Sequence, residues 1–201
     1  MKHTRILALV LAAAAASFAL GDRTVFDTTH TPPPPNPRKG APFVVGLELG
    51  ANSLASVLGG RFTWYPFQNV ALDAGGSWSQ SGLRGGFGAR YFLSDSFCSP
   101  FVGVAWKRSA GVDSASLDDG KSTASQVTMN PIQWVDAQVG YEIRNSDGLV
   151  VIFTTGWSFA ITPEEERWRR VSGTISKDAS DNLSLYTGSG PIGAIAVGFG
   201  F

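Results

Sequence analysis

Hydrophobic and polar residues alternate along the chain from residue 43 to the C-terminus. Alternation with a period of two is typical of β-strands, because successive side chains point to opposite faces of a sheet. Glycine, proline, asparagine and aspartate interrupt the pattern and mark turns. Pro66 is expected to end the second strand, because its nitrogen has no hydrogen to donate. The pattern predicts eight strands, near residues 43–52, 57–66, 69–79, 83–92, 99–108, 130–144, 148–161 and 184–201.

The connections between these strands alternate in length. Residues 67–68, 93–98 and 145–147 form short connections, the last of them in a typical turn sequence that ends at Gly148. Residues 109–129 and 162–183 form long connections. In an up-and-down arrangement, all the long connections fall at one rim and all the short ones at the other. Bacterial outer-membrane barrels have short periplasmic turns and longer external loops, so the lengths favour that class.

The two faces of each predicted strand differ in size as well as in polarity. In the first strand Phe43, Val45, Leu47 and Leu49 share one face, opposite smaller residues and Glu48. A narrow eight-stranded barrel is nearly filled by its inward side chains, which suits small residues. The bulky face therefore fits lipid, and the pattern predicts an all-β, eight-stranded antiparallel up-and-down transmembrane β-barrel. A water-soluble barrel that buries the bulky face is the alternative.

Aromatic residues of the bulky face gather toward the ends of the predicted strands. Such rings are typical of the level at which lipid headgroups meet water. We expect one aromatic girdle at the long-loop rim and another at the turn rim. The loop-rim set comprises Trp78, Trp106 and Trp157, and the turn-rim set includes Trp64, Tyr91 and Tyr141.

The small-residue face carries four basic and four acidic side chains, which we expect to line the lumen. Unpaired charge in such a narrow space is costly, so the balance predicts ion pairs that largely close the lumen. Charges solvated by trapped water, or lining a narrow pore, are the alternatives. Counted from the turn rim, the predicted layers are Arg90 with Glu142, then Glu48 with Arg61 and Asp73, then Lys107 with Asp136 and Arg84.

The N-terminal region predicts export. A basic start precedes an apolar run that ends at a small-x-small site, so residues 1–19 are expected to be a secretory signal peptide. Residues 20–42 include a run of prolines, which cannot join a sheet. We expect an extended, solvated periplasmic tail that acts as a spacer or touches a partner. Residues 43–201 form the predicted barrel, and no apolar run long enough for a membrane helix, about 18 residues, follows the signal.

The composition argues against most catalytic and nucleic-acid chemistry. The only histidines, His3 and His30, lie outside the predicted barrel. This removes nucleophile–histidine schemes and ordinary histidine metal sites, so we expect no catalytic residue, cofactor or metal. The single cysteine, Cys98, cannot form an internal disulfide, and a formal net charge of zero gives no electrostatic case for nucleic acid.

The long connections hold three further patterns. Asp119-Gly120-Lys121-Ser122 resembles the end of a phosphate loop, but Ala115 stands where the motif needs its first glycine. Asp113, with Asp118 and Asp119, forms an acidic loop that calcium could bind only loosely. The charged segment 164–170 contains three arginines and a tryptophan, and it could contact lipopolysaccharide phosphates or remain a solvated loop.

In its alternating strands, interior charges and C-terminal aromatic, the chain resembles small outer-membrane barrels of the OmpA transmembrane-domain, OmpX and OmpW type. The resemblance covers residues 43–201 and is one of architecture. Members end in a signal for the barrel-assembly machinery, and Phe199 and Phe201 match its aromatic positions. Ala196 and Ala194 stand where the family has a glycine and a polar residue.

The resemblance implies a bacterial outer-membrane location. The expected partners are outer-membrane lipid, lipopolysaccharide and the barrel-assembly machinery, whereas the ligand of the long loops stays open. We expect a non-enzymatic protein with a structural or surface-interaction role. A narrow pore for small solutes or ions is the second reading, and a lipid-active enzyme without histidine is the third.

Overall fold

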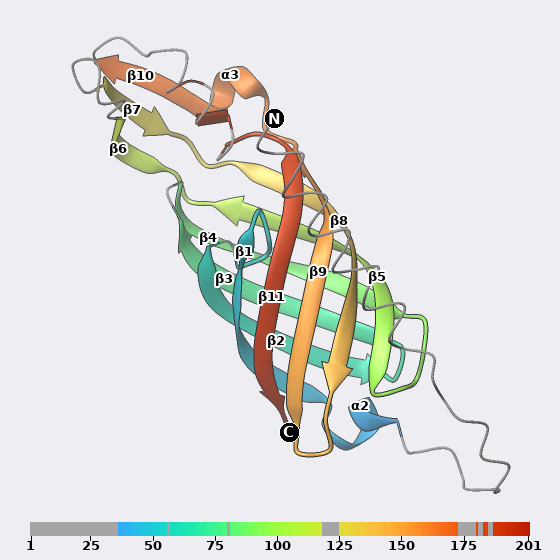
Figure 1. Cartoon of the computed structure of the whole chain (residues 1–201). Coiled ribbons are helices and arrows are strands. Elements are labelled where there is room, and N and C mark those ends of the chain that lie inside the picture. Colours follow the sequence, from blue (N-terminus) through green and yellow to red (C-terminus); the bar gives the residue numbers. More distant parts are fainter. Residues whose placement is uncertain are drawn as a thin grey trace, which may run out of the picture.

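Eight strands close into an antiparallel up-and-down barrel (Figure 1). The structure, a computed structural model, describes residues 36–55, 57–79, 81–117, 125–172, 180, 183–184 and 187–201. The order around the barrel is β1-β11-β9-β8-β5-β4-β3-β2. The eight strands are β1 (Phe43–Ala51), β2 (Leu58–Phe67), β3 (Val70–Ser79), β4 (Gly82–Phe92), β5 (Cys98–Ser109), β8 (Gln133–Arg144), β9 (Leu149–Ala160) and β11 (Gly190–Gly200).

The first and last strands of the chain close the barrel. β1 pairs with β11 in a continuous register from Val44 opposite Gly200 to Ala51 opposite Gly193. The Phe43 N–H donates to the Phe201 carbonyl at 3.1 Å, and the Phe201 N–H donates back to Phe43 at 2.9 Å. Closure pairs the backbone groups that two free sheet edges would otherwise leave open. The predicted fold class, an all-β eight-stranded barrel, is confirmed.

Most predicted strand boundaries differ from the structure by about one residue, and three of the differences have a physical cause. The second strand runs through Pro66 to Phe67, where a register shift after Trp64 leaves the proline outside the regular ladder. The sixth predicted strand, 130–144, begins at Gln133, because Pro131 cannot donate to a neighbour. The eighth, 184–201, begins at Gly190, because the chain before it turns, with the Gly188 N–H donating to the Ser184 carbonyl.

Three short connections, 68–69, 93–97 and 145–148, lie at the rim where the chain ends. The β1–β2 and β3–β4 connections are also short but lie at the opposite rim, so the expectation that all short connections share one rim is wrong. In the turn between β8 and β9, the Asn145 side-chain oxygen accepts from the backbone N–H groups of Asp147 and Leu149 at 3.0 and 2.8 Å. Gly148 follows with φ +89°, a conformation that costs glycine no steric strain. The turn predicted from Asn145 to Gly148 is therefore confirmed. A one-turn helix, α2 (Pro37–Gly40), lies at this same end of the barrel (Figure 1).

The long connections carry a second, smaller sheet at the opposite rim. It consists of β6 (Val112–Leu117), β7 (Ser125–Met129) and β10 (Trp168–Ser172), in the order β10-β7-β6. A short helix, α3 (Glu164–Arg167), leads into β10. Val127, Met129 and Leu183 are buried together, and Trp168 packs against them. The sheet projects beyond the barrel (Figure 1). No helix in the described part of the chain is long and apolar enough to cross a bilayer.

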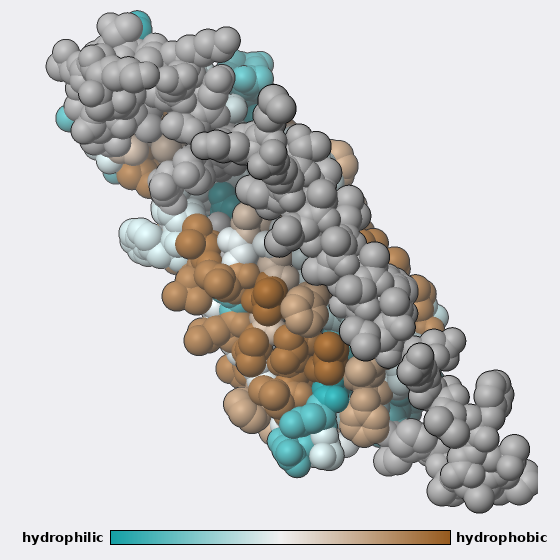
Figure 2. Space-filling model, viewed as in Figure 1, coloured by the Kyte–Doolittle hydropathy of each residue, from teal (hydrophilic) through white to brown (hydrophobic). Residues whose placement is uncertain are grey.

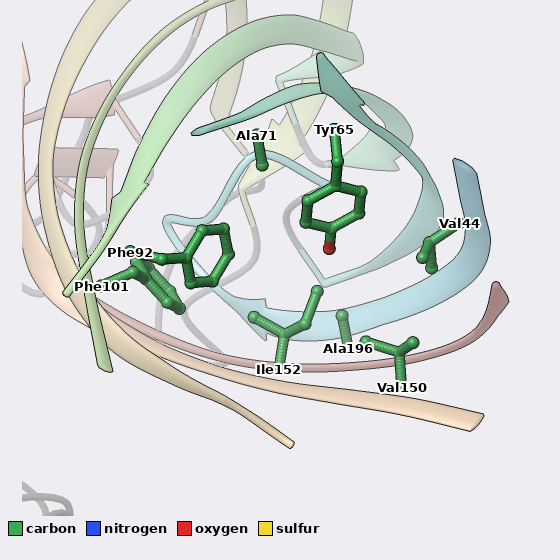
Figure 3. Packing of buried hydrophobic residues seen from close by; sticks show 8 residues of the cluster. All are labelled: Val44, Tyr65, Ala71, Phe92, Phe101, Val150, Ile152 and Ala196. Atoms are coloured by element: carbon green, nitrogen blue, oxygen red, sulfur yellow. The ribbon is translucent and has the colours of Figure 1, made fainter. Parts of the chain in front are cut away.

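An apolar layer fills the barrel interior near the turn rim. Phe92 and Phe101 meet edge to face with ring centroids 5.8 Å apart, and the Tyr65 ring lies 6.0 Å from Phe92. Figure 3 shows these rings converging on the barrel axis with smaller aliphatic residues around them. Gly140 makes room for the layer, because a Cβ there would stand 2.4 Å from Cζ of Phe101. The small-residue face is thus complementary to the few large rings that it encloses.

Candidate functional site: the lumen and the outer face

The outer face of the barrel is an apolar belt. Figure 2 shows hydrophobic side chains across the barrel wall and hydrophilic ones toward the two rims. Monomeric soluble proteins rarely expose contiguous apolar surface of this kind, because each large side chain left in water forgoes about 1.5–3 kcal/mol. Every barrel strand contributes to the belt, for example through Leu47, Phe62, Leu72, Phe87, Val104, Val139, Phe153 and Val197.

The six aromatic residues expected in the girdles all lie on this outward face. Trp64, Trp78, Tyr91 and Trp157 are exposed, and Trp78 reaches 77%. Trp106 and Tyr141 are half-buried. The Trp106 ring packs on Phe87 at 5.3 Å between centroids, and its Nε1 donates to the Gln133 amide oxygen at 3.3 Å. Phe199 and Phe201, the expected assembly-signal residues, are also exposed.

All eight charged residues expected in the lumen are buried and inward-facing. The central group joins three neighbouring strands. The Arg61 guanidinium lies 2.5 Å from Glu48 Oε2 and 3.1 Å from Asp73 Oδ2. The Thr63 hydroxyl also donates to Asp73, at 2.6 Å. The structure therefore brings together the three residues that strand order had placed side by side, and each carboxylate has a charged partner at hydrogen-bond distance.

Arg90 connects the central group to the turn-side layer. Its Nε lies 2.6 Å from Asp73 Oδ2, and its Nη2 donates to Asp73 Oδ1 at 2.9 Å. Its Nη1 lies 3.3 Å from Glu142 Oε2. The guanidinium also sits 4.9 Å from the centroid of the Phe101 ring. The two layers expected from the sequence are thus one continuous chain of ion pairs.

The third predicted layer lies nearer the loops. Lys107 Nζ is 2.9 Å from Asp136 Oδ1, and it also donates to the Asn52 carbonyl. The Arg84 guanidinium stacks on the Trp134 ring at 4.4 Å. Trp134 is buried, and its Nε1 donates to the carbonyl of Gly188, just before β11, at 3.1 Å.

The connection between β1 and β2 enters the lumen, which the sequence pattern did not indicate. Leu54 and Ala55 are buried, and the Ala55 N–H donates to Glu48 Oε1 at 3.0 Å. A Cβ on Gly75, across the lumen wall, would stand 3.1 Å from the Leu54 side chain. The apolar pair in a short turn was the only available signal. This segment fills the space above the central ion pairs.

At the turn-side mouth, the end of the N-terminal tail differs from its expected structure. The last residues of the tail were expected to be extended and solvated, but Pro37–Gly40 form α2 and Arg38 is 1% exposed. Arg38 Nε lies 3.1 Å from Glu142 Oε1, and Arg144 Nε lies 2.9 Å from the same atom. The Tyr65 hydroxyl donates to Glu142 Oε2 at 2.6 Å. Burial lowers the pKa of the Arg38 guanidinium, while the charge of Glu142 opposes that shift.

Arg38, Arg144 and Tyr65 are therefore site residues that sequence reasoning missed. Arg144 and Tyr65 share the inward parity of Glu142 and Arg61, so strand alternation could have found them. Arg38 lies before the first strand, where no periodicity exists. Only the structure identifies it.

The other sequence features are placed as follows. Cys98 is a free, exposed cysteine. Asp113 and the acidic residues of α3 are exposed, as are Arg169 and Arg170 of β10. Among residues 36–55, 57–79, 81–117 and 125–172 and the short described stretches after them, no cluster of metal-ligating side chains occurs. Residues 118–122, with most of the phosphate-loop pattern, lie outside the described residues, as do 1–35.

No family model matches the chain, and no curated protein sequence matches it. Among solved structures, the barrel is similar to Acinetobacter baumannii CarO, with 13% identity, a TM-score of 0.41, and coverage of 79% of this chain and 97% of that one. Acinetobacter baumannii CarO2 gives 14% identity, a TM-score of 0.41, and coverage of 80% and 99%.

Proposed function

We propose that the protein is an integral β-barrel of the bacterial outer membrane with a structural or surface-interaction role and a lumen closed by ion pairs. The observation that carries the proposal is the inverted distribution of polarity. An apolar belt covers the outside of a closed barrel, whereas ten buried charged side chains of the described residues, the eight expected ones with Arg38 and Arg144, occupy its inside. In hydrocarbon only helices and closed barrels satisfy every backbone group, and the belt then faces acyl chains.

The filled lumen supports a non-enzymatic, non-transporting role. Ion pairs run from Glu48 through Arg61, Asp73 and Arg90 to Glu142. The apolar layer around Phe92 packs beside the turn-side end of this chain, where Arg38 and Arg90 both contact the Phe92 ring, and Leu54 lies at the loop side. Surface interaction would then fall to the small sheet at the loop rim, which projects from the barrel.

The proposed partners follow from the same placement. Outer-membrane lipid would cover the belt, and lipopolysaccharide would meet the exposed arginines of β10 at the loop rim. The barrel-assembly machinery would read Phe199 and Phe201, which stand exposed at the end of the last strand. In these respects the chain resembles barrels of the OmpA transmembrane-domain, OmpX and OmpW type. No nucleic acid is expected.

Single-tryptophan variants test the membrane assignment directly. One variant keeps only Trp157, which is exposed on the outward face, and its matched control keeps only Trp134, which is buried in the lumen. Both are reconstituted into vesicles whose acyl chains carry bromine. We expect strong quenching of Trp157 fluorescence and little quenching of Trp134. Equal, weak quenching of the two, with a protein that stays monomeric in water without detergent, would overturn the proposal.

A narrow pore is the second candidate, and one observation favours it. The buried hydroxyls of Ser77, Thr154 and Ser158 have no hydrogen-bond partner among the described residues. Such groups are commonly satisfied by water, so the lumen would hold water at these hydroxyls. A conducting path would also have to pass the ion pairs and the apolar layer.

A further inference from the structure

The turn-side mouth surrounds the Arg38 guanidinium on several sides. Its Nε lies 3.1 Å from Glu142 Oε1, and its Nη1 donates to the carbonyls of Gln68 and Ser94 at 3.3 and 3.2 Å. Those carbonyls belong to two different turns. The guanidinium carbon of Arg38 lies over the Phe92 ring, 3.8 Å from its centroid. Carboxylate, carbonyls and ring together engage Nε, Nη1 and one flat face of the guanidinium, whereas Nη2 is buried without a hydrogen-bond partner among the described residues.

The site does not depend on Arg38 for its own integrity. Glu142, which is fully buried, keeps Arg90, Arg144 and Tyr65 as partners when Arg38 leaves. The carbonyls of Gln68 and Ser94 belong to turns that the barrel strands fix at both ends. Removing Arg38 therefore leaves an empty guanidinium-binding site and no unpaired buried charge.

The segment that carries Arg38 has few other attachments. α2 is a single turn of four residues, too short to be stable alone. Among the described residues, its remaining side-chain contacts to the barrel are an exposed bond from Asn36 to Asp95 at 3.1 Å and one from Arg144 to the Ala41 carbonyl at 3.2 Å. One backbone bond, from the Tyr65 N–H to the Pro42 carbonyl at 2.8 Å, joins the end of the segment to β2. A depression of about 530 Å³ runs beside Arg38 along residues 65–69, which gives solvent a route to the site.

We propose that the turn-side mouth is a guanidinium receptor, occupied by Arg38 of the same chain, and that this occupancy is the latch that holds the segment before β1 over the lumen. The latch is reversible, because its release exposes no unpaired carboxylate. A free guanidinium compound of similar size competes for the receptor and binds fully once Arg38 is removed. An ammonium ion does not, because it lacks the planar fork.

Cleavage after Lys39 reports whether the segment is docked. Lys39 is exposed and lies next to Arg38 in α2. We expect a lysine-specific protease to cut there at least about tenfold faster in Arg38→Ala than in wild type, in detergent micelles, because hydrogen bonds to a charged group are lost. Phe92→Leu keeps Arg38 but removes the ring on which its guanidinium stacks, so the protease should also cut this variant faster than wild type. Equal rates in wild type and Arg38→Ala would overturn the latch.

Ethylguanidinium at millimolar concentration tests the receptor itself. It should raise the thermal unfolding midpoint of Arg38→Ala more than that of wild type, because the site of the variant is empty whereas Arg38 competes for the site in wild type. Ethylammonium at the same concentration is the matched probe and should do nothing. In wild type, ethylguanidinium should speed cleavage after Lys39 by competition. Equal effects of the two cations on Arg38→Ala would show that the site has no guanidinium specificity and would refute the proposal.

Discussion

Arg90 is the residue on which the buried charges depend most. It holds Asp73 through two nitrogens, and it reaches Glu142 through a third. All three side chains are almost fully buried, so no solvent can replace a lost partner. Desolvated charges are tolerable only when they are paired, and removing one partner costs more than the pair contributes.

Replacing Arg90 with alanine should lower the free energy of unfolding by about 1.5–3 kcal/mol, because charged hydrogen bonds are lost while Asp73 keeps Arg61 and Glu142 keeps Arg144. The matched control is Arg108→Ala, because Arg108 is exposed and on the outward face of the neighbouring strand, β5. That change should fall within about 0.5 kcal/mol of wild type. Urea titration of both variants in lipid vesicles measures the difference. A midpoint for Arg90→Ala equal to that of Arg108→Ala would mean that water already screens the network.

The sequence predicted most of the charged residues that face inward, but only some of their ion-pair partners. Strand parity alone places Asp136 and Glu142 inside, because each lies between outward-facing residues. The order of the strands also predicts Lys107 beside Asp136. Parity cannot show how far a long side chain reaches, so the link from Arg90 to both layers was not predictable. Nor could it predict Arg38, whose position depends on tertiary contacts alone.

Among the elements, we expect the sheet of β6, β7 and β10, the loop sheet, to unfold separately from the barrel. Its core consists of Val127, Met129 and Leu183, with Trp168 against it. No strand of this sheet pairs with a barrel strand. Segments with a small core of their own can open without global unfolding.

Val127→Asp tests that separation. Val127 is fully buried, so an aspartate there would be a buried charge without a partner and should open the sheet. Proteolysis within residues 112–129 and 168–172 should become at least about tenfold faster. The unheated protein should still migrate as a compact barrel on a gel. Val171→Asp, at an exposed position of β10, should change neither property. Loss of the compact form in Val127→Asp would show that sheet and barrel unfold together.

The barrel strands were predictable because each is long and its two faces carry residues of different size and polarity. β6, β7 and β10 were not, since strands of five or six residues show too few alternations to stand out from loops. Their pairing also joins residues far apart in sequence, as in Trp168 opposite Met129. Pro66 was misjudged for a related reason, because a bulge that tolerates proline depends on the neighbouring strand.

For the whole molecule, the question is whether the lumen is sealed. The apolar layer lies in the barrel interior at the turn side, and its two phenylalanine rings, Phe92 and Phe101, come from neighbouring strands. The ion-pair chain adjoins this layer through Arg90, which lies near the Phe101 ring. The even number of strands and their closure were predictable from the connections. The closure of the lumen by packed side chains was not predictable, because it depends on side chains that meet across the lumen.

Planar-bilayer recording separates a sealed barrel from a narrow pore. Wild-type protein should show no stable conductance steps, because ions would have to displace both paired charges and packed rings. Replacing Phe92 and Phe101 together with alanine should open short-lived conductance, since truncating both rings removes most of the apolar layer. The matched control replaces Phe87 and Phe153, which face outward, and should stay silent. Steady conductance of the wild type would instead establish the pore. If the variant with Phe92 and Phe101 replaced shows no conductance, the ion pairs alone close the lumen.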